Sequence, residues 1–200
     1  MRTLVVRATI SPMTGSTIAK QFGTYIDDTS ELSDEEIYLL MNKIFGMIYM
    51  QPLRVYKKIA SLTMSAGQAT LPTDFLYLPT GTQFRTSGGK MHLLTLEEVI
   101  DNKSGLYIDG TLLKSTSATQ DGTIKFVYQK KPADITANTS PEMLPDTLTY
   151  AIVHGMCSDD FMIQQFEKPR SYRDEQNALY LDYLSKILIW DSKFTKNIYL

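Results

Sequence analysis

The sequence has few of the residues that build catalytic or metal centres. It contains one cysteine, Cys157, and two histidines, His92 and His154. A single cysteine cannot form an intrachain disulfide, which fits a reduced compartment such as the bacterial cytoplasm. No phosphate-binding loop is present, because the lysine of Gly88-Gly89-Lys90 is not followed by serine or threonine. We therefore expect a protein that is not an enzyme, with no catalytic residues, no metal ligands and no cofactor.

The chain also lacks an excess of charge of either sign and a long apolar run. Twenty basic and twenty-two acidic residues give a formal net charge of −2, whereas a dedicated nucleic-acid binder should be markedly basic. A neutral wall facing DNA stays compatible with this balance, because tight phosphate contacts would hinder sliding. No window of roughly 18 apolar residues occurs, so we expect no membrane-spanning helix. The N-terminus lacks the apolar core and the cleavage site of a signal peptide.

Helical patterns occupy both ends of the sequence. Ser33 and Glu36 form a capping-box sequence. Apolar residues then recur at spacings of three and four, which predicts an amphipathic helix over 33–50. Other helices are expected over 14–25, over 145–166 and from about 169 into the 190s. Ala151 and Gly155, one turn apart, should let a second helix approach the 145–166 helix closely.

The last predicted helix carries two adjacent apolar stripes. The first stripe consists of Tyr180, Tyr183, Ile187, Trp190 and Phe194. The second consists of Leu181, Leu184 and Leu188. One stripe is enough to cover an ordinary core. The second stripe indicates burial on two sides, either against another subunit or in a helix that is fully internal to the chain.

Between the helical regions the pattern changes to short strands and tight turns. Six of the eleven glycines lie between Gly81 and Gly122. Glycine accepts positive φ, so three dipeptides predict hairpin turns: Gly88-Gly89, Asp109-Gly110 and Asp121-Gly122. Strands are expected at 55–64, 83–85, 91–94, 106–108, 111–113 and 124–128. A helical turn is expected over 95–100, with Thr95 as its cap.

These patterns predict an α+β fold. It should be mainly an α-helical bundle of about four helices, with an antiparallel β-rich insertion in the middle of the chain. We expect one domain over 1–200. Its parts would be an N-terminal arm and helices at 1–52, the insertion at 53–131, a linker at 132–145, and C-terminal helices and a tail at 146–200.

Three groups of polar residues were considered as possible metal or catalytic sites. His154, Cys157 and Asp160 are spaced by three on one predicted helix, but a metal site needs three or four converging ligands. A Cys-His nucleophile needs a third group that orients the base. A semi-buried histidine beside a core thiol is the favoured interpretation. Asp159-Asp160 diverge around a helix, so they indicate a solvated edge or partners for the basic residues of a neighbour.

Two basic pairs, Lys57-Lys58 and Lys130-Lys131, lie in or just after predicted strands. Adjacent strand residues point to opposite faces, so the pairs form no patch unless the strands lie together. Solvated surface is the favoured interpretation, and a contact with DNA phosphates or an acidic partner is the alternative.

The order of the motifs resembles the head-to-tail connector proteins of tailed bacteriophages, the portal and tail adaptors. The resemblance spans about 14–195 and begins with a short helix and the acidic pair Asp27-Asp28. The further elements, in order, are the capped helix with Asn42, the 55–64 strand, Leu71-Pro72-Thr73-Asp74-Phe75, the 124–128 strand, and Leu144-Pro145 followed by two long helices.

The resemblance implies a structural virion protein without catalysis. It implies a ring of twelve subunits under the portal, linking the capsid to the tail or nozzle proteins, with genomic double-stranded DNA passing through the lumen without sequence-specific binding. The protein would lie in the virion neck and be made in the host bacterial cytoplasm. The portal-binding residues that the resemblance implies are Trp190, Phe194, Ile198, Tyr199 and Leu200.

Two alternatives stay open at the level of sequence. The first is another neck protein, such as a tail-completion or stopper protein, although those usually lack two long C-terminal helices. The second is a small hydrolase or metal enzyme that uses His154 and Cys157.

Overall fold

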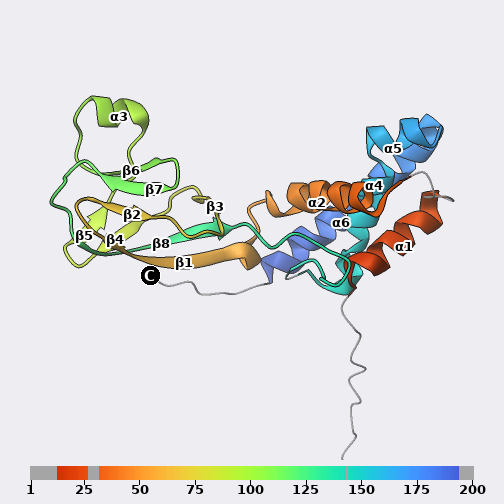
Figure 1. Cartoon of the computed structure of the whole chain (residues 1–200), viewed down its shortest axis with the longest axis horizontal. Coiled ribbons are helices and arrows are strands. Elements are labelled where there is room, and N and C mark those ends of the chain that lie inside the picture. Colours follow the sequence, from red (N-terminus) through yellow and green to blue (C-terminus); the bar gives the residue numbers. More distant parts are fainter. Residues whose placement is uncertain (1–12, 27–31, 143, 194–200) are drawn as a thin grey trace, which may run out of the picture. The chain divides into compact units, whose positions relative to one another are not determined.

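The computed structural model describes residues 13–26, 32–142 and 144–193. The chain divides into two compact units, Met1–Gln51 with Ala133–Asp191 and Pro52–Pro132 with Ser192–Leu200. Helices make up the first unit, and antiparallel strands dominate the second (Figure 1). The predicted α+β class, with antiparallel strands in the middle of the chain, is confirmed. We refer to the two parts as the helical unit and the β unit.

The first helix, α1 (Gly15–Ile26), is held at its start by the chain that returns from the β unit. The amide of Gly15 donates to the carbonyl of Thr139 at 2.8 Å, and that of Ser16 to the carbonyl of Ala137 at 3.1 Å. These bonds satisfy amides that a helix leaves unpaired at its N-terminus. A Cβ on Gly15 would lie 2.3 Å from the carbonyl oxygen of Thr136, so the close approach requires glycine.

The second helix, α2 (Asp34–Tyr49), begins at the predicted capping box. The Ser33 hydroxyl accepts from the Glu36 amide at 3.3 Å, and the Glu36 carboxylate accepts from the Ser33 amide at 2.8 Å. The Ser33 hydroxyl also donates to the Glu36 carboxylate at 2.7 Å. The hydrogen bonds that the carboxylate accepts, first from the backbone and then from the side chain of Ser33, lower the pKa of Glu36. The predicted apolar positions are buried, as expected: Ile37, Leu40, Met41, Ile44, Phe45 and Ile48.

The expected 145–166 helix is three shorter pieces, which corrects that prediction. They are η2 (Asp146–Leu148), α4 (Tyr150–Cys157) and α5 (Asp160–Gln165). The Ser158 hydroxyl donates to the carbonyl of Gly155 at 3.0 Å, and the Asp159 carboxylate accepts from the amide of Phe161 at 3.1 Å. Asp159 therefore caps a new helix, and the described part of the helical unit holds five α-helices instead of about four.

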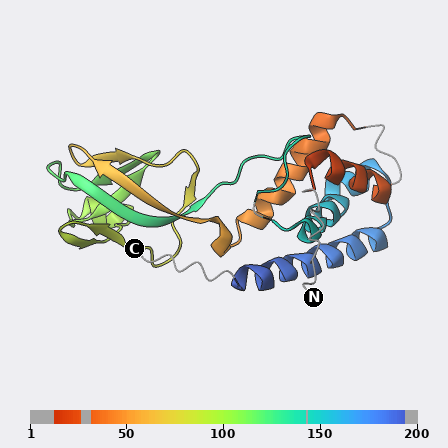
Figure 2. The same ribbon diagram turned by 90° about the horizontal axis from the view of Figure 1, so that it is seen from below.

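The last helix, α6 (Arg170–Ser192), runs through the range predicted for it. Within the helical unit, α4 lies among α1, α2 and α6 (Figures 1 and 2). A Cβ on Gly155 of α4 would lie 2.5 Å from Cγ2 of Ile44 on α2 and 3.2 Å from Cδ2 of Tyr180 on α6. The predicted close approach at Gly155 is therefore confirmed, and it involves two helices.

The β unit contains two antiparallel sheets. One has five strands, with the order β1-β8-β4-β5 and β3 also paired to β8; the other has the order β2-β7-β6. The strands of the first sheet are β1 (Lys57–Met64), β3 (Phe75–Tyr77), β4 (Phe84–Thr86), β5 (Gly89–Met91) and β8 (Gly122–Lys130). Those of the second are β2 (Gln68–Thr70), β6 (Leu106–Asp109) and β7 (Leu112–Ser115). A 3-10 turn, η1 (Arg54–Tyr56), precedes β1.

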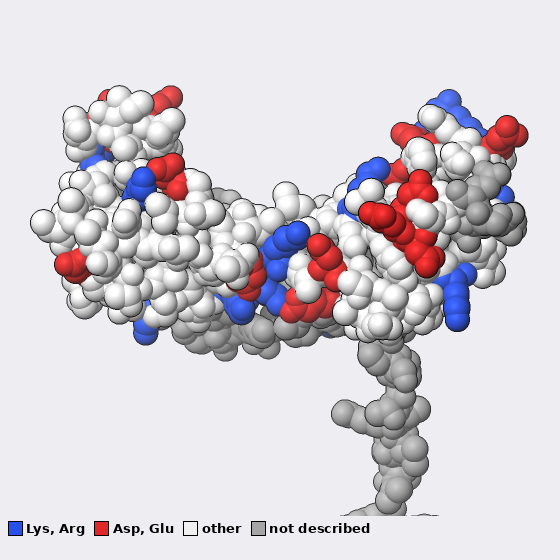
Figure 3. Space-filling model, in the orientation of Figure 1, with Lys and Arg blue, Asp and Glu red and all other residues white. Residues whose placement is uncertain are grey.

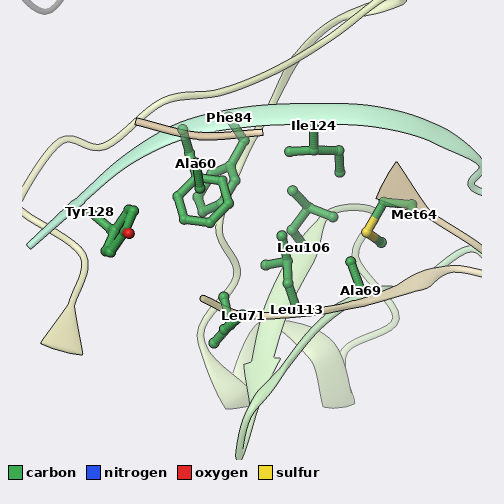
Figure 4. Packing of buried hydrophobic residues seen from close by; sticks show 10 residues of the cluster. Ala60, Met64, Ala69, Leu71, Phe84, Leu106, Leu113, Ile124 and Tyr128 are labelled. Atoms are coloured by element: carbon green, nitrogen blue, oxygen red, sulfur yellow. The ribbon is translucent and has the colours of Figure 1, made fainter. Parts of the chain in front are cut away.

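The β unit has a core of its own between its strands. Alternate residues of β8 face inward, namely Ile124, Phe126 and Tyr128. In Figure 4, Ile124 lies beside Leu106 and Leu113 of the second sheet, and the same core includes Ala60, Met64 and Phe84 of the first. The short helix α3 (Leu96–Ile100) adds no buried residue to this core, although Thr95 and Glu98 form a capping box at its start.

Most predicted β elements are confirmed, and several details are wrong. The β4–β5 and β6–β7 hairpins form where they were expected, but their two-residue turns are Ser87-Gly88 and Gly110-Thr111, one residue away from the predicted pairs Gly88-Gly89 and Asp109-Gly110. Asp121-Gly122 forms no hairpin turn, because β7 and β8 belong to different sheets and the Asp121 carboxylate accepts from the Ala66 amide at 2.9 Å. The predicted strand at 91–94 ends at Met91, and residues 55–56 belong to η1.

We expect Gly155→Val to destabilise the helical unit, because its side chain must displace Ile44 and Tyr180. Overpacking of this kind costs about 1–3 kcal/mol in the free energy of unfolding. Gly46→Ala in α2 is the matched control, since the nearest atom to its Cβ is the Tyr49 hydroxyl at 3.6 Å; it should be neutral or stabilise by up to about 1 kcal/mol. Urea unfolding followed by circular dichroism measures both. Equal stability of the two variants would contradict the packing argument.

Candidate functional site

The Leu-Pro-x-Asp-Phe segment forms a structural junction of the β unit. Asp74 accepts from the Tyr128 hydroxyl at 2.6 Å and from the Lys58 ammonium at 2.8 Å. The ring of Phe75 stacks on Tyr128 at 5.8 Å between centroids. The carbonyl of Asp74 accepts from the amide of Lys131 at 2.7 Å. One residue thus ties β1 and β8 to the start of β3.

Burial and hydrogen bonds together set the pKa values of the side chains at this junction. Burial by itself would raise the pKa of Asp74, but the bonds from Lys58 and Tyr128 lower it below its ordinary value. Burial, followed by the hydrogen bond and the charge of Asp74, raises the pKa of Tyr128. The carboxylate is therefore ionised and the phenol protonated at neutral pH, which is the state that keeps the junction closed.

Lys57 and Lys58 lie on β1 and Lys130 lies on the adjacent strand β8, since Lys57 is opposite Gln129 and Lys58 is opposite Tyr128; Lys131 follows the end of β8. They form no simple basic patch. Lys58 is paired with Asp74, and Lys130 is 9% exposed. On the face drawn in Figure 3, the basic and acidic side chains of the described residues are interspersed. The solvated-surface interpretation therefore holds only in part, since Lys130 is buried.

Every residue of α4 from Ala151 to Cys157 is buried, so His154 and Cys157 lie in the core. The expected core thiol is confirmed, and His154, at 4% exposed, is more deeply buried than the expected semi-buried histidine. Nδ1 of His154 lies 2.8 Å from Oε1 of Gln176, and its ring stacks on Tyr183 at 5.6 Å between centroids. Burial raises the pKa of Cys157 to about 12, against smaller opposing effects of a Tyr172 hydrogen bond and the Lys168 charge. A thiol with that pKa is not an activated nucleophile.

The third member of the predicted His-Cys-Asp group is placed elsewhere. Asp160 begins α5 and pairs with Arg173 at 2.9 Å, and Asp159 pairs with Lys43. Both aspartates therefore have basic partners within the chain. Among the residues that the structure describes, no three or more His, Cys, Asp or Glu side chains are grouped so that they could hold a metal ion.

Asn42 has a role that sequence reasoning did not assign. Its side-chain amide donates to the carbonyl of Ile135 at 3.0 Å, and its side-chain oxygen accepts from the amide of Ile135 at 2.7 Å. The side-chain amide of Asn42 also donates to the carbonyl of Tyr38 at 2.9 Å. Asn42 thus binds both the backbone amide and the backbone carbonyl of Ile135, which lies in the chain that returns from the β unit. Its position in the middle of an amphipathic helix was the available signal, but its partner lies 93 residues away.

The helical unit exposes an apolar concavity between α2 and α5, which we call the α2–α5 hollow. Its volume is about 270 Å³, and its lining includes Leu39, Lys43, Phe161 and Met162. Leu39 is 72% exposed and Phe161 is 55% exposed. The ion pair of Lys43 and Asp159 borders it.

The helix α6 exposes a convex apolar surface, which we call the α6 ridge and which consists of Leu181, Leu184 and Leu188. Leu181 is 50% exposed, Leu188 is 43% exposed, and Leu184 is half-buried. On the adjacent stripe of the helix Tyr180 and Ile187 are buried. The helix is therefore not fully internal to the chain, which removes one of the two interpretations of its apolar stripes.

The residues expected to bind the portal are only partly within the described ranges. Trp190 lies near the end of α6 and is half-buried. Phe194, Ile198, Tyr199 and Leu200 lie outside the described residues. In those ranges, no helix combines the length and the apolar character that crossing a bilayer demands.

The described part of the chain thus has two hydrogen-bonded junctions, at Asp74 and at Asn42, and two exposed apolar surfaces on the helical unit. The family model of the SU10 adaptor proteins matches residues 13–195. The chain belongs to this family of phage head-to-tail adaptors and is a structural protein of a bacteriophage. A search of curated proteins gave no match.

We expect Asp74→Asn to destabilise the β unit by about 1–3 kcal/mol at pH 7, because it removes the charge that two donors share. The pKa of Asp74 is lower in the folded protein than the unfolded value of about 3.9. Its stabilisation is thus present above that value and is lost as the pH falls through the folded pKa. Urea unfolding at neutral and acidic pH should show the difference between the two proteins shrinking below pH ~4. Asp109→Asn, at an exposed ion pair, is the control and should change little.

We expect Asn42→Ala to loosen the returning chain without unfolding α2. The substitution leaves both polar backbone groups of Ile135 without the side chain that binds them. Hydrogen exchange at the Ile135 amide should accelerate by about tenfold or more, which corresponds to the loss of roughly 1–2 kcal/mol of local stability. Asn177→Ala, on the exposed side of α6, serves as the control. Unchanged exchange at Ile135 would contradict the role of Asn42.

Proposed function

We propose that this adaptor assembles as a ring of twelve subunits under the portal and joins the capsid to the tail or nozzle proteins. Membership of the SU10 adaptor family over 13–195 is the observation that carries the proposal. A closed ring needs each subunit to offer two different lateral surfaces. The α2–α5 hollow and the α6 ridge are two such surfaces. Residues 1–200 would act in the ring as a single adaptor domain.

Genomic double-stranded DNA passes through the lumen of the proposed ring without sequence-specific binding. The net charge of −2 supports this part of the proposal, because a strongly basic wall would hold the phosphates and slow the DNA. The ion pairs at Lys43, Lys58 and Lys186 support it as well, since each lowers the free positive charge that the surface presents. The protein would lie in the virion neck after synthesis in the host cytoplasm.

The proposed contact with the portal is the end of α6 and the segment that follows it. Its residues are Trp190, Phe194, Ile198, Tyr199 and Leu200. Tryptophan is enriched among residues that dominate binding energy, and a short apolar terminus is well suited to an apolar pocket on a partner. Trp190 is half-buried at the end of a helix, which would give the contact a rigid base.

We expect the full chain to bind the cognate portal, and a chain that ends at residue 193 to bind at least tenfold more weakly. Loss of one buried aromatic contact of about 1.4 kcal/mol or more is enough for such a change. Trp190→Ala should weaken binding in the same direction. Light scattering and electron microscopy of portal mixtures measure complex and ring formation.

Cys157→Ala is the control in this experiment, because the thiol is buried and inactive; it should bind like the natural chain. Portal binding that survives removal of 194–200 would refute the assignment of the C-terminal contact while the adaptor function stands. A full chain that neither binds the portal nor forms rings on it would overturn the proposed function and favour another neck or tail-completion protein.

A further inference from the structure

We propose that residues 3–10 of one subunit, which we call the arm, add a strand to the free edge of β1 in the neighbouring subunit. The inference rests on the proposed ring and names a contact that links its members. The arm lies outside the described residues. What identifies it as the occupant is its sequence, its length and the point at which it joins the fold.

The outer edge of β1 is long and open. β1 is the end strand of its sheet, with β8 on one side (Figure 1). In the part of the chain that the structure describes, residues 57–62 have no backbone partner other than β8. The strand β2 meets β1 only beyond this stretch, where Ser65 and Gln68 exchange two backbone hydrogen bonds. A row of unpaired backbone groups of this kind is a template for a strand from another chain.

This edge carries few of the features that block strand pairing, which are proline, bulges and charge. β1 contains no proline, and its register with β8 runs from Lys57 to Met64 without a shift. Its charges are confined to the first two residues, and Lys58 is paired with Asp74. The other strands at the ends of the two sheets, β2, β5 and β6, span only three or four residues. β1 is therefore the edge that can hold an added strand.

The arm has the sequence pattern of a strand with one apolar face. Side chains alternate across a strand, and one row of the arm is entirely apolar: Leu4, Val6, Ala8 and Ile10. The other row is mostly polar: Thr3, Val5, Arg7 and Thr9. Pro12 closes the run, because proline cannot donate a hydrogen bond to a neighbouring strand. The eight residues of the arm are enough to cover the open stretch of β1.

The two faces of β1 match the two rows of the arm. Ala60 and Met64 point into the core of the β unit, and Leu62 in the same row is half-buried at the margin of that core. The opposite row is exposed: Ile59, Ser61 and Thr63. Residues opposite each other on paired strands share a face. An added arm would therefore cover Leu62 with its apolar row and place its polar row beside Ser61.

A second copy is the occupant that turns this pairing into a ring contact. The arm joins the fold at Met13, whose amide donates to the Asp146 carboxylate at 3.0 Å in the helical unit. The twelve residues before Met13 reach at most roughly 40 Å, which is enough to extend to an adjacent subunit. An arm and an edge are different surfaces, so the contact repeats head to tail, and exchange of such a segment between copies is a low-cost route to assembly.

Disulfide cross-linking on portal-bound assemblies tests the pairing. Ser61→Cys is combined with one cysteine in the arm, placed in turn at positions 5, 6, 7, 8 and 9, and the assemblies are oxidised with copper phenanthroline. Residues opposite each other in a ladder have Cα atoms about 4.5–5.5 Å apart, within the range of a disulfide. The strongest ladder of covalent oligomers on a non-reducing gel should come from one of positions 5, 7 and 9. Positions 6 and 8 should give little product, since their side chains point to the other face.

Three controls accompany this series. The natural chain is the blank, because Cys157 is buried and its pKa is raised. A mixture of the two matching single variants should give dimers only, since each copy then carries half of the pair. Arg7→Cys combined with Ser87→Cys should not cross-link, because Ser87 is exposed at the turn between β4 and β5, away from the edge of β1.

Two adjacent substitutions place the same charge on opposite faces of the arm. Val6→Asp should raise the concentration needed for ring formation roughly tenfold or more, because the contact would bury its carboxylate beside Leu62. Val5→Asp is the matched control and should change that concentration little, since position 5 lies in the polar row. Neither variant alters a residue of the described fold. Light scattering of portal mixtures measures both.

Each contrary result has a separate meaning. Rings that form on the portal without a Ser61 cross-link to the arm overturn this inference and leave the proposed function intact. Equal cross-linking at odd and even positions means that the arm is near β1 without forming a strand, which overturns it. Monomers with an internal disulfide mean that the arm pairs with its own subunit, and a cross-link from Ser61→Cys to Ile198→Cys means that the C-terminal segment occupies the edge; both overturn it. If the natural chain forms no rings on the portal, the proposed function and this inference fail together.

Discussion

The helical unit depends on fixing two chain segments that the β unit separates in sequence. The first segment ends at Gln51 and the second begins at Ala133. Asn42 binds both polar groups of Ile135, and the start of α1 binds the carbonyls of Ala137 and Thr139. The helical unit thus uses the returning chain as a helix cap and as a backbone partner for α2. These bonds fix the segment that leads on to α4, whose Gly155 packs against Ile44.

The residues of the motifs that carry the family resemblance make contacts that stabilise the fold. Asp74 is occupied with Lys58 and Tyr128 inside the β unit. Leu144 is buried, and the carbonyl of Pro145 accepts from the amide of Leu148 at 2.8 Å to open the turn before α4. These residues therefore indicate the fold of an adaptor. The contacts that an adaptor makes with other chains have to come from surfaces that such motifs do not mark.

Patterns among neighbouring residues predicted much of the fold, whereas features that depend on long-range contacts were predicted wrongly. The capping box at Ser33 predicted the start of α2, and glycine pairs predicted two hairpins to within one residue of their turns, because each depends on residues a few positions apart. The 145–166 helix was predicted without its break, since Asp159 was read as a helix residue and not as a cap. Asp121-Gly122 was predicted as a turn because nothing local shows that β7 and β8 join different sheets.

The candidate site also has some features that could be predicted from the sequence and others that could not. Burial of His154 and Cys157 could be predicted from their apolar neighbours and from the scarcity of further ligands. The hollow could not, because it exists only where Leu39 and Phe161, far apart in the sequence, come together beside the Lys43–Asp159 ion pair. The exposure of the ridge was one of two possibilities left by the pattern, and only the packing of α4 against Tyr180 decides between them.

The geometry of α6 would let one helix serve the two proposed kinds of contact, one lateral and one with the portal. Successive residues turn by about 100°, so Trp190 lies about 200° around the helix from Leu188. The buried positions Tyr180 and Ile187 lie between these directions on one side of the helix. A lateral contact through the ridge and an axial contact through Trp190 would therefore use different flanks and would not compete. A ring subunit needs this separation, because it must hold its neighbours and its portal at the same time.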